Sequence, residues 1–217
     1  HQYYMYEHGI AAFALGEACA VARASGRTPE PRYLRGLRKA MGFIEEMQHD
    51  DGGWRYRPDR ELPSDTSVTG WQVLAIKTAQ QAGIPVSDHC LSRIGPFFDA
   101  HAVEETGQTR YQAARTSSEA TTGVGMLARQ FLLGEADSPM VDKAAEFLAD
   151  LAEKRWNTKS KRERDRDFYL WYNCSLALFH EGGETWERWN DVVRDTLVDL
   201  QRSDGCARGS WDPKSRW

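Results

Sequence analysis

Apolar residues recur every three or four positions over long windows of the chain, and the alternating pattern of a β-strand is nearly absent. That periodicity is typical of amphipathic α-helices. Eight helices are therefore predicted, separated by helix breakers such as Gly26, Pro63 and Pro139. The expected ranges are 3–24, 31–48, 65–82, 87–102, 117–133, 139–154, 167–181 and 186–202. The pattern predicts an all-α protein.

Four of these helices share one sequence frame. Gly9, Gly70, Gly123 and Tyr172 hold equivalent positions in it, at steps of 61, 53 and 49 residues. The residues five positions earlier are Tyr4, Asp65, Ser118 and Asp167. The last three of these are of types that cap helix N-termini. The four helices are rich in glycine and alanine and apolar on most sides, so they are predicted to pack on two faces as an inner layer.

The helices between them repeat as well. Lys39, Arg93 and Lys143 are equivalent, at steps of 54 and 50 residues, and each is followed by an apolar pair four positions later. These helices carry charge on one face, which we expect to meet water as an outer layer. Inner and outer helices therefore alternate, and the repeat predicts four helical hairpins.

Composition bounds the function classes. The 217 residues, 41% hydrophobic and 28% charged, suit one domain over 1–217. A net charge of −4 gives no general attraction to phosphate backbones, so nucleic acid is not an expected partner. No run of 18 apolar residues exists, so no transmembrane helix is expected. The chain starts at His1 and no charged-then-apolar leader follows, so we expect that a leader has been removed or that this is a fragment, and the compartment stays open.

The stretch 39–54 resembles, position for position, the QW repeat of squalene cyclases and protein prenyltransferases. A weaker copy with Gln201 and Trp211 ends the chain. Stretches 51–58, 65–72 and 209–213 are similar to those of bacterial prenyltransferase/squalene-oxidase repeat proteins. The resemblance covers nearly the whole sequence.

The resemblance implies an α/α toroid, in which inner helices are ringed by outer ones around a central cavity. Closed toroids of this superfamily have five to seven hairpins, whereas four fill this chain. We therefore expect a fragment of a longer toroid or a permanently open ring, and open edges favour self-association. Gln48 and Trp54 are interpreted as a structural staple: Gln48 would bond the backbone of a neighbouring helix end, and Trp54 would cover the turn.

In squalene cyclases, an Asp-x-Asp-Asp-Thr motif supplies the proton that starts cyclisation. Asp65 matches the last carboxylate of that motif, but the proton donor's position holds Ser64, and a hydroxyl cannot protonate an alkene. Asp65 is therefore either a helix cap or a catalytic acid. The adjacent pair Glu7 and His8 is a second candidate for acid–base chemistry, or one turn of ordinary helix.

Aromatic residues gather near the starts of the inner helices, above all Tyr4, Trp71, Trp171 and Tyr172. In a cyclase such rings would line the cavity and stabilise carbocations through their π faces; the alternative is core packing. The resemblance thus implies an apolar isoprenoid ligand. A cavity with room for a polyprenyl chain would favour that function, and a centre filled by Trp71, Trp171 and Tyr172 would favour a non-catalytic protein-interaction scaffold.

Protein prenyltransferases hold a catalytic zinc with Asp, Cys and His, for which Cys174, His180 and the segment 204–206 are the candidates here. Neither the Asp-x-Cys nor the late Tyr-His pattern of those enzymes is present, so no metal and no cofactor is predicted. The four cysteines show no disulfide framework and are expected to be buried thiols. The only basic run, 154–166, is interpreted as a solvated loop or, alternatively, a contact for a partner or an anionic head group.

Overall fold

The computed structural model describes residues 3–58, 62–156 and 167–212. Over these residues it contains eight α-helices, a π-helical turn and a two-stranded antiparallel sheet. The helices are α1 (Tyr4–Ala24), α2 (Pro31–Glu46), α3 (Thr66–Gln81), α4 (Asp88–His101), α5 (Glu119–Ala128), α6 (Pro139–Trp156), α7 (Phe168–Glu181) and α8 (Gly183–Leu200). The sheet pairs β1 (Ala102–Val103) with β2 (Gln108–Thr109), and the π-helical turn η1 (Arg129–Leu133) extends α5. The all-α prediction is confirmed.

The eight helices begin and end within a few residues of the predicted bounds, and two local features differ from the prediction. The sheet between α4 and α5 was not predicted, because strands of two residues are too short for an alternating pattern. The predicted helix 117–133 changes at Arg129 from α to π hydrogen bonding, and Gly134 closes it in the left-handed conformation. The basic run lies outside the described residues from 157 onward.

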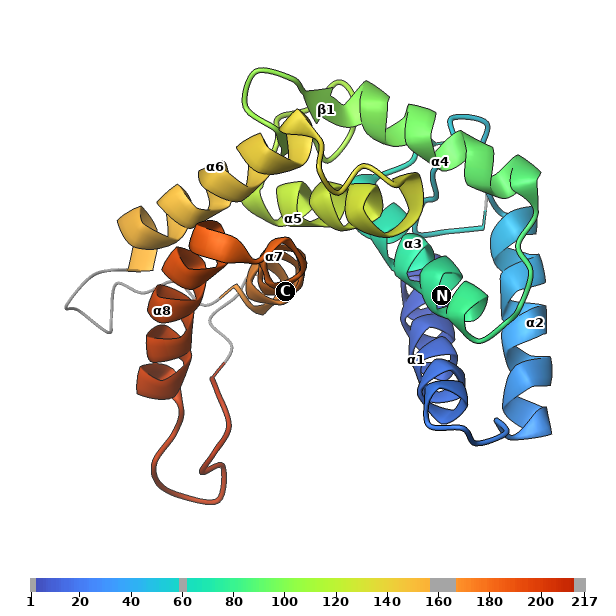
Figure 1. Cartoon of the computed structure of the whole chain (residues 1–217), viewed down its shortest axis with the longest axis horizontal. Helices are drawn as coiled ribbons and strands as arrows, with labels where there is room; N and C mark the ends of the chain where they lie inside the picture. Colours follow the sequence, from blue (N-terminus) through green and yellow to red (C-terminus); the bar gives the residue numbers. More distant parts are fainter. Residues whose placement is uncertain (1–2, 59–61, 157–166, 213–217) are drawn as a thin grey trace.

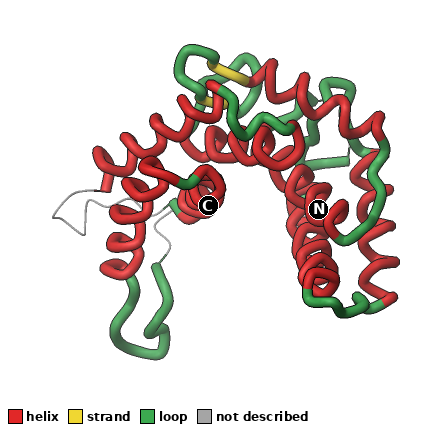
Figure 2. The backbone as a smooth tube through the Cα atoms, viewed as in Figure 1, coloured by secondary structure: helices red, strands yellow, loops and turns green. Residues whose placement is uncertain are grey.

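The helices form an arc of two layers (Figure 1). Helices α1, α3, α5 and α7 contact one another in that order and lie along the inside of the arc, with α2, α4, α6 and α8 outside them. The same alternation is visible in the tube view, where loops connect the layers at the rims (Figure 2). Inner and outer layers therefore follow the sequence repeat. Among the described residues, no helix combines the length and the apolar character that spanning a membrane requires.

Side chains cap three of the inner helices at the predicted positions. Asp65, Ser118 and Asp167 each accept a hydrogen bond from the backbone N–H three residues later, which is the geometry of an N-cap. The cap of α1 is Tyr3, which makes no such side-chain bond. Each side-chain cap contributes about 1 kcal/mol to stability.

Glycines of the shared frame let the inner helices approach closely. A Cβ on Gly9 would lie 2.5 Å from Nε2 of Gln72 in α3, and one on Gly70 would lie 2.4 Å from Val124 in α5. On Gly123 it would lie 2.8 Å from the Cys174 sulfur in α7. Each of the three successive contacts between inner helices thus needs a glycine, because any larger residue would clash with the neighbouring helix.

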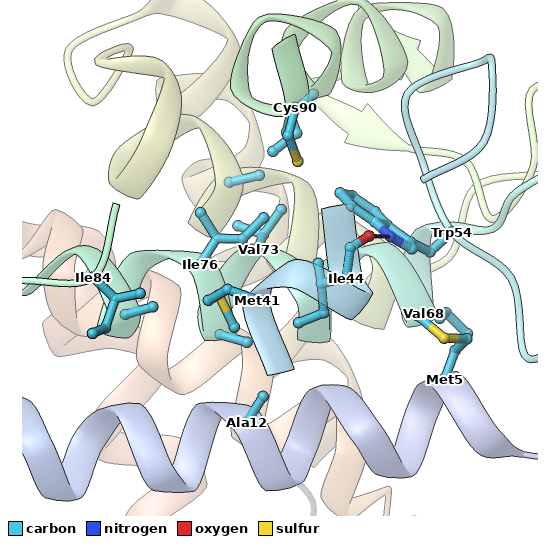
Figure 3. Packing of buried hydrophobic residues seen from close by; sticks show 14 of the residues in the cluster. Met5, Ala12, Met41, Ile44, Trp54, Val68, Val73, Ile76, Ile84 and Cys90 are labelled. Atoms are coloured by element: carbon cyan, nitrogen blue, oxygen red, sulfur yellow. Dashed lines mark hydrogen bonds between the residues drawn. The ribbon is translucent and has the colours of Figure 1, made fainter. Parts of the chain in front are cut away.

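The turn of residues 48–54, here called the first turn, fastens α2 to its neighbours. The Nε2 of Gln48 donates to the carbonyl oxygen of Cys90 in α4 at 3.1 Å. The indole Nε1 of Trp54 donates to the carbonyl oxygen of Ile44, in the last turn of α2, at 2.8 Å. Figure 3 shows this bond inside the core, where Trp54 is fully buried. The predicted staple is confirmed.

Residues 201–211, here called the last turn, repeat this arrangement after α8. Gln201 Nε2 donates to the carbonyl oxygen of Gly209 at 2.8 Å, and Trp211 Nε1 donates to that of Leu197 at 2.7 Å. The corresponding bonds within the first turn are both 2.8 Å long. The two turns differ in burial, because 36% of the Trp211 surface is exposed.

Candidate functional site

A set of aromatic rings crosses the inside of the arc. Trp71 of α3 lies at its centre: the ring centroids of Tyr6 and Phe13 of α1 are 5.9 and 6.2 Å from it, and that of Tyr172 of α7 is 5.7 Å away, stacked. Tyr56 stacks on Tyr6 at 5.9 Å. Because α5 lies between α3 and α7 in the inner layer, a contact between Trp71 and Tyr172 puts both rings on the concave side. These five residues are called the concave aromatic face.

Exposed apolar side chains continue this face along two helices. On α1, Tyr3, Ile10 and Val21 are 51%, 37% and 53% exposed. Tyr3 is the N-cap residue before α1, and Ile10 and Val21 are spaced from Tyr6 and Phe13 so that they share one side of the helix. On α7, Phe179 is 61% exposed and lies two turns beyond Tyr172. These exposed apolar residues flank the rings around Trp71; the exposed Glu17 lies among them on α1, and the Phe179 ring also contacts Trp186 of α8 at 5.4 Å.

Asp65 lies at the start of α3 and has no exposed surface. Its carboxylate accepts hydrogen bonds from the Ser67 hydroxyl at 2.6 Å and from the Val68 N–H at 2.9 Å. Arg55 completes the set with an ion pair at 3.0 Å. Three donors therefore hold the carboxylate, and one of them is charged.

Burial raises the pKa of Asp65 above its ordinary value, and the bonds from Ser67 and Val68 and the charge of Arg55 oppose that rise. The tyrosines around it respond to the same burial. Desolvation raises the pKa of Tyr6 and, more strongly, of Tyr111, whose hydroxyl lies 3.4 Å from Arg55. The phenols are therefore neutral hydrogen-bonding groups at physiological pH.

The structure separates the predicted acid–base candidates. His8 Nε2 lies 3.3 Å from the carbonyl oxygen of Ala40, and its ring contacts Phe43 of α2 at 5.0 Å. Glu7 is exposed on α1, and adjacent helical residues point in different directions. Asp65 instead contacts residues of its own helix start and Arg55. His8 therefore contacts α2, whereas Asp65 contacts Arg55 and the start of α3.

Of the four predicted cavity residues, two lie on the concave side and two do not. Trp71 and Tyr172 stack on the concave side. Trp171 is 3% exposed and packs edge-on against Trp156 and Phe168 in the core. The ring of Tyr4, 44% exposed, contacts those of His8 and Phe43 toward α2.

The zinc candidates are dispersed. Cys174 is buried against the carbonyl oxygen of Glu119 at 3.4 Å, and burial raises the pKa of its thiol well above the ordinary value. His180 packs against Phe131, and Cys206 is exposed in the last turn. Within the described residues, no group of three or more His, Cys, Asp or Glu could hold a metal ion.

Sequence reasoning missed Tyr56, Arg55 and Tyr111 as neighbours of Asp65 and Tyr6. Tyr56 and Arg55 precede α3 in an irregular segment, whose backbone is fixed by the bond from the Met5 N–H to the Tyr56 carbonyl oxygen at 2.9 Å. The one available signal for Arg55 and Tyr56 was their place within the resembling stretch 51–58, and no signal pointed to Tyr111. No family model matches the chain, and a search of curated proteins also found no match.

Proposed function

We propose that this chain is a squalene-cyclase-like, open α/α toroid whose concave aromatic face binds an isoprenoid or a similarly extended apolar molecule. The observation that carries the proposal is the bridge made by Trp71, which joins the exposed stripe of α1 to that of α7. Half-exposed rings in a row offer an apolar chain both buried area and flat contact surfaces. The two helical layers and the resembling stretches support the toroid.

Binding without turnover is the form of the proposal. A cyclising enzyme needs a carboxylic acid that presents its proton to the alkene. Asp65 caps α3, pairs with Arg55 and has no exposed surface. The position of the family's proton donor holds Ser64, whose hydroxyl cannot protonate an alkene. Asp65 therefore has a structural role beside the concave aromatic face, through Arg55 and Tyr56.

The test incubates the full chain with squalene and with polyprenyl diphosphates and measures the extracted lipid by mass spectrometry. We expect bound lipid on the unmodified chain, and about tenfold less on the Tyr172→Ala variant, since loss of one stacked ring removes roughly 1.4 kcal/mol or more. Tyr33→Ala is the matched control, because Tyr33 is a similarly exposed ring on the outer helix α2. Circular dichroism confirms that each variant is folded.

Three outcomes decide the proposal. Recovery of no lipid, or equal recovery from Tyr172→Ala, would overturn binding at the concave face. A cyclised product that disappears in Asp65→Asn would overturn binding without turnover and restore the acid role of Asp65.

A non-catalytic scaffold for a protein partner is the second candidate. It is favoured by the stacking of Trp71 on Tyr172 at 5.7 Å, which fills the middle of the concave face with the chain's own side chains. A scaffold predicts no bound lipid in the same experiment, whereas the proposed apolar site predicts bound lipid that depends on the Tyr172 ring.

A further inference from the structure

The turns that follow α2 and α4 are locked by the next outer helix in the same way. Arg93 of α4 donates to the carbonyl oxygen of His49 in the first turn at 2.5 Å. Lys143 of α6 donates to the carbonyl oxygen of Glu104, between β1 and β2, at 2.6 Å. Arg93 and Lys143 are equivalent in the outer-helix repeat. A basic residue at this position therefore binds the turn of the preceding hairpin.

Lys39 is the third member of this set, on α2, and it is exposed. Within the described part of the chain, no hydrogen-bond acceptor or acidic group pairs with its ammonium group. The donor that locks two other hairpins is thus free on the first one.

The last turn offers the complementary half. In the first turn the His49 carbonyl oxygen accepts from the Gly52 N–H at 3.0 Å and from Arg93. In the last turn the Arg202 carbonyl oxygen accepts from the Gly209 N–H at 2.8 Å, and over the described residues no basic side chain supplies the second bond. The same turn leaves Trp211 partly exposed, while Trp54 is covered completely.

The outer helices at the two edges carry opposite charge. Helix α2 has four basic residues before its first acid, and three lie on neighbouring turns of one side, Arg32, Arg35 and Lys39. Helix α8 carries five acidic residues against two arginines. Its Glu187 and Asp191 are exposed and one turn apart, and Asp191 also pairs with Arg194 of the same helix at 3.2 Å. An acidic edge beside the last turn therefore matches a basic edge beside Lys39.

We propose that a second copy of this chain docks head to tail, with the last turn and α8 of one copy against α2 of the other. Lys39 of one copy then occupies, on the Arg202 carbonyl oxygen, the place that Arg93 holds on His49, and Trp211 becomes covered. Donor, acceptor and both charges belong to this one chain, which is why a second copy is the occupant. The contact is heterologous, so repeated docking closes a ring or extends a filament. It does not depend on the proposed ligand.

Sedimentation velocity of the full chain over the micromolar range tests the inference. We expect mass to increase with concentration, and association to weaken with added salt because charges contribute to it. The variant Arg35→Glu/Lys39→Glu is expected to weaken association about tenfold or more, and Glu187→Lys/Asp191→Lys by a similar factor. A mixture of the two variants regains association, because the unmodified α2 of the Glu187→Lys/Asp191→Lys variant can dock on the unmodified α8 and last turn of the other variant.

Control variants separate this contact from nonspecific association. Arg115→Glu changes an exposed charge in the loop before α5 and should leave association unchanged. Circular dichroism and the recovery in the mixture show that the reversed variants are folded. A chain that stays monomeric throughout, or associates equally with reversed charges, would overturn the proposal. Monomers that bind only another protein would assign the edges to a different occupant.

Discussion

Replacing Trp54 and Trp211 separately by phenylalanine measures how much one hydrogen bond contributes in two different surroundings. Both indoles donate to a carbonyl oxygen near the end of the preceding outer helix, at 2.8 and 2.7 Å. Trp54 has no exposed surface, while Trp211 is 36% exposed. The two variants therefore remove the same bond with and without access to water.

The cost at Trp54 follows from two effects. Phenylalanine leaves the carbonyl oxygen of Ile44 without its donor in a buried place, which costs about 1–3 kcal/mol. The smaller ring leaves a void that adds about 1 kcal/mol. We therefore expect Trp54→Phe to lower the free energy of unfolding by about 3 kcal/mol. At Trp211 water replaces the indole, and the loss is about 0.5 kcal/mol.

Urea unfolding followed by circular dichroism, at concentrations where the chain is monomeric, gives both values. In a thermal melt the Trp54 variant should lose roughly 6–12 °C, since 1 kcal/mol corresponds to about 2–4 °C at this size. Equal losses for the two variants, or a loss below about 1 kcal/mol at Trp54, would refute the argument that burial sets the cost.

Three further predictions test the caps, the close helix contact and the buried histidine. Asp65→Asn keeps an N-cap but loses the ion pair with Arg55 and should cost about 1–3 kcal/mol, whereas Asp65→Ala loses the cap as well and should cost about 1 kcal/mol more; urea unfolding measures both. Gly70→Ala should lose about 1–3 kcal/mol because its Cβ would lie 2.4 Å from Val124, while Gly42→Ala, with nothing within 4 Å, should gain about 0.5 kcal/mol. His101 has a pKa lowered by burial, so the unfolded chain binds more protons; stability should fall as the pH drops below 6.5, and His101→Phe should reduce that slope in urea titrations.

Helical periodicity predicted the architecture because each helix carries its own burial pattern. The frame of Gly9, Gly70 and Gly123 identified the inner layer correctly, since a close helix contact needs a small residue at the same place in every repeat. The capping residues Ser118 and Asp167 were predicted for the same reason, as capping is local chemistry. Local rules repeated along the chain therefore gave most of the fold.

The concave face was predicted only in part, because a residue's neighbours depend on helix rotation. Trp171 and Tyr172 are adjacent in the sequence, and each residue turns a helix by about 100°. That rotation buries Trp171 against Trp156 and exposes Tyr172 beside Trp71. Tyr56 was out of reach for another reason, since it belongs to an irregular segment that no periodicity describes.

The partners of Asp65 connect the cap to the face. Desolvation favours the neutral acid, but the charge of Arg55 and the bonds from Ser67 and Val68 stabilise the carboxylate. A proton on Asp65 would have to displace a charged donor at 3.0 Å before any substrate could receive it. Arg55 also lies 5.5 Å from the ring of Tyr56, which stacks on Tyr6. The carboxylate thus holds the arginine that lies against Tyr56 of the concave aromatic face, a structural role that proton donation would disrupt.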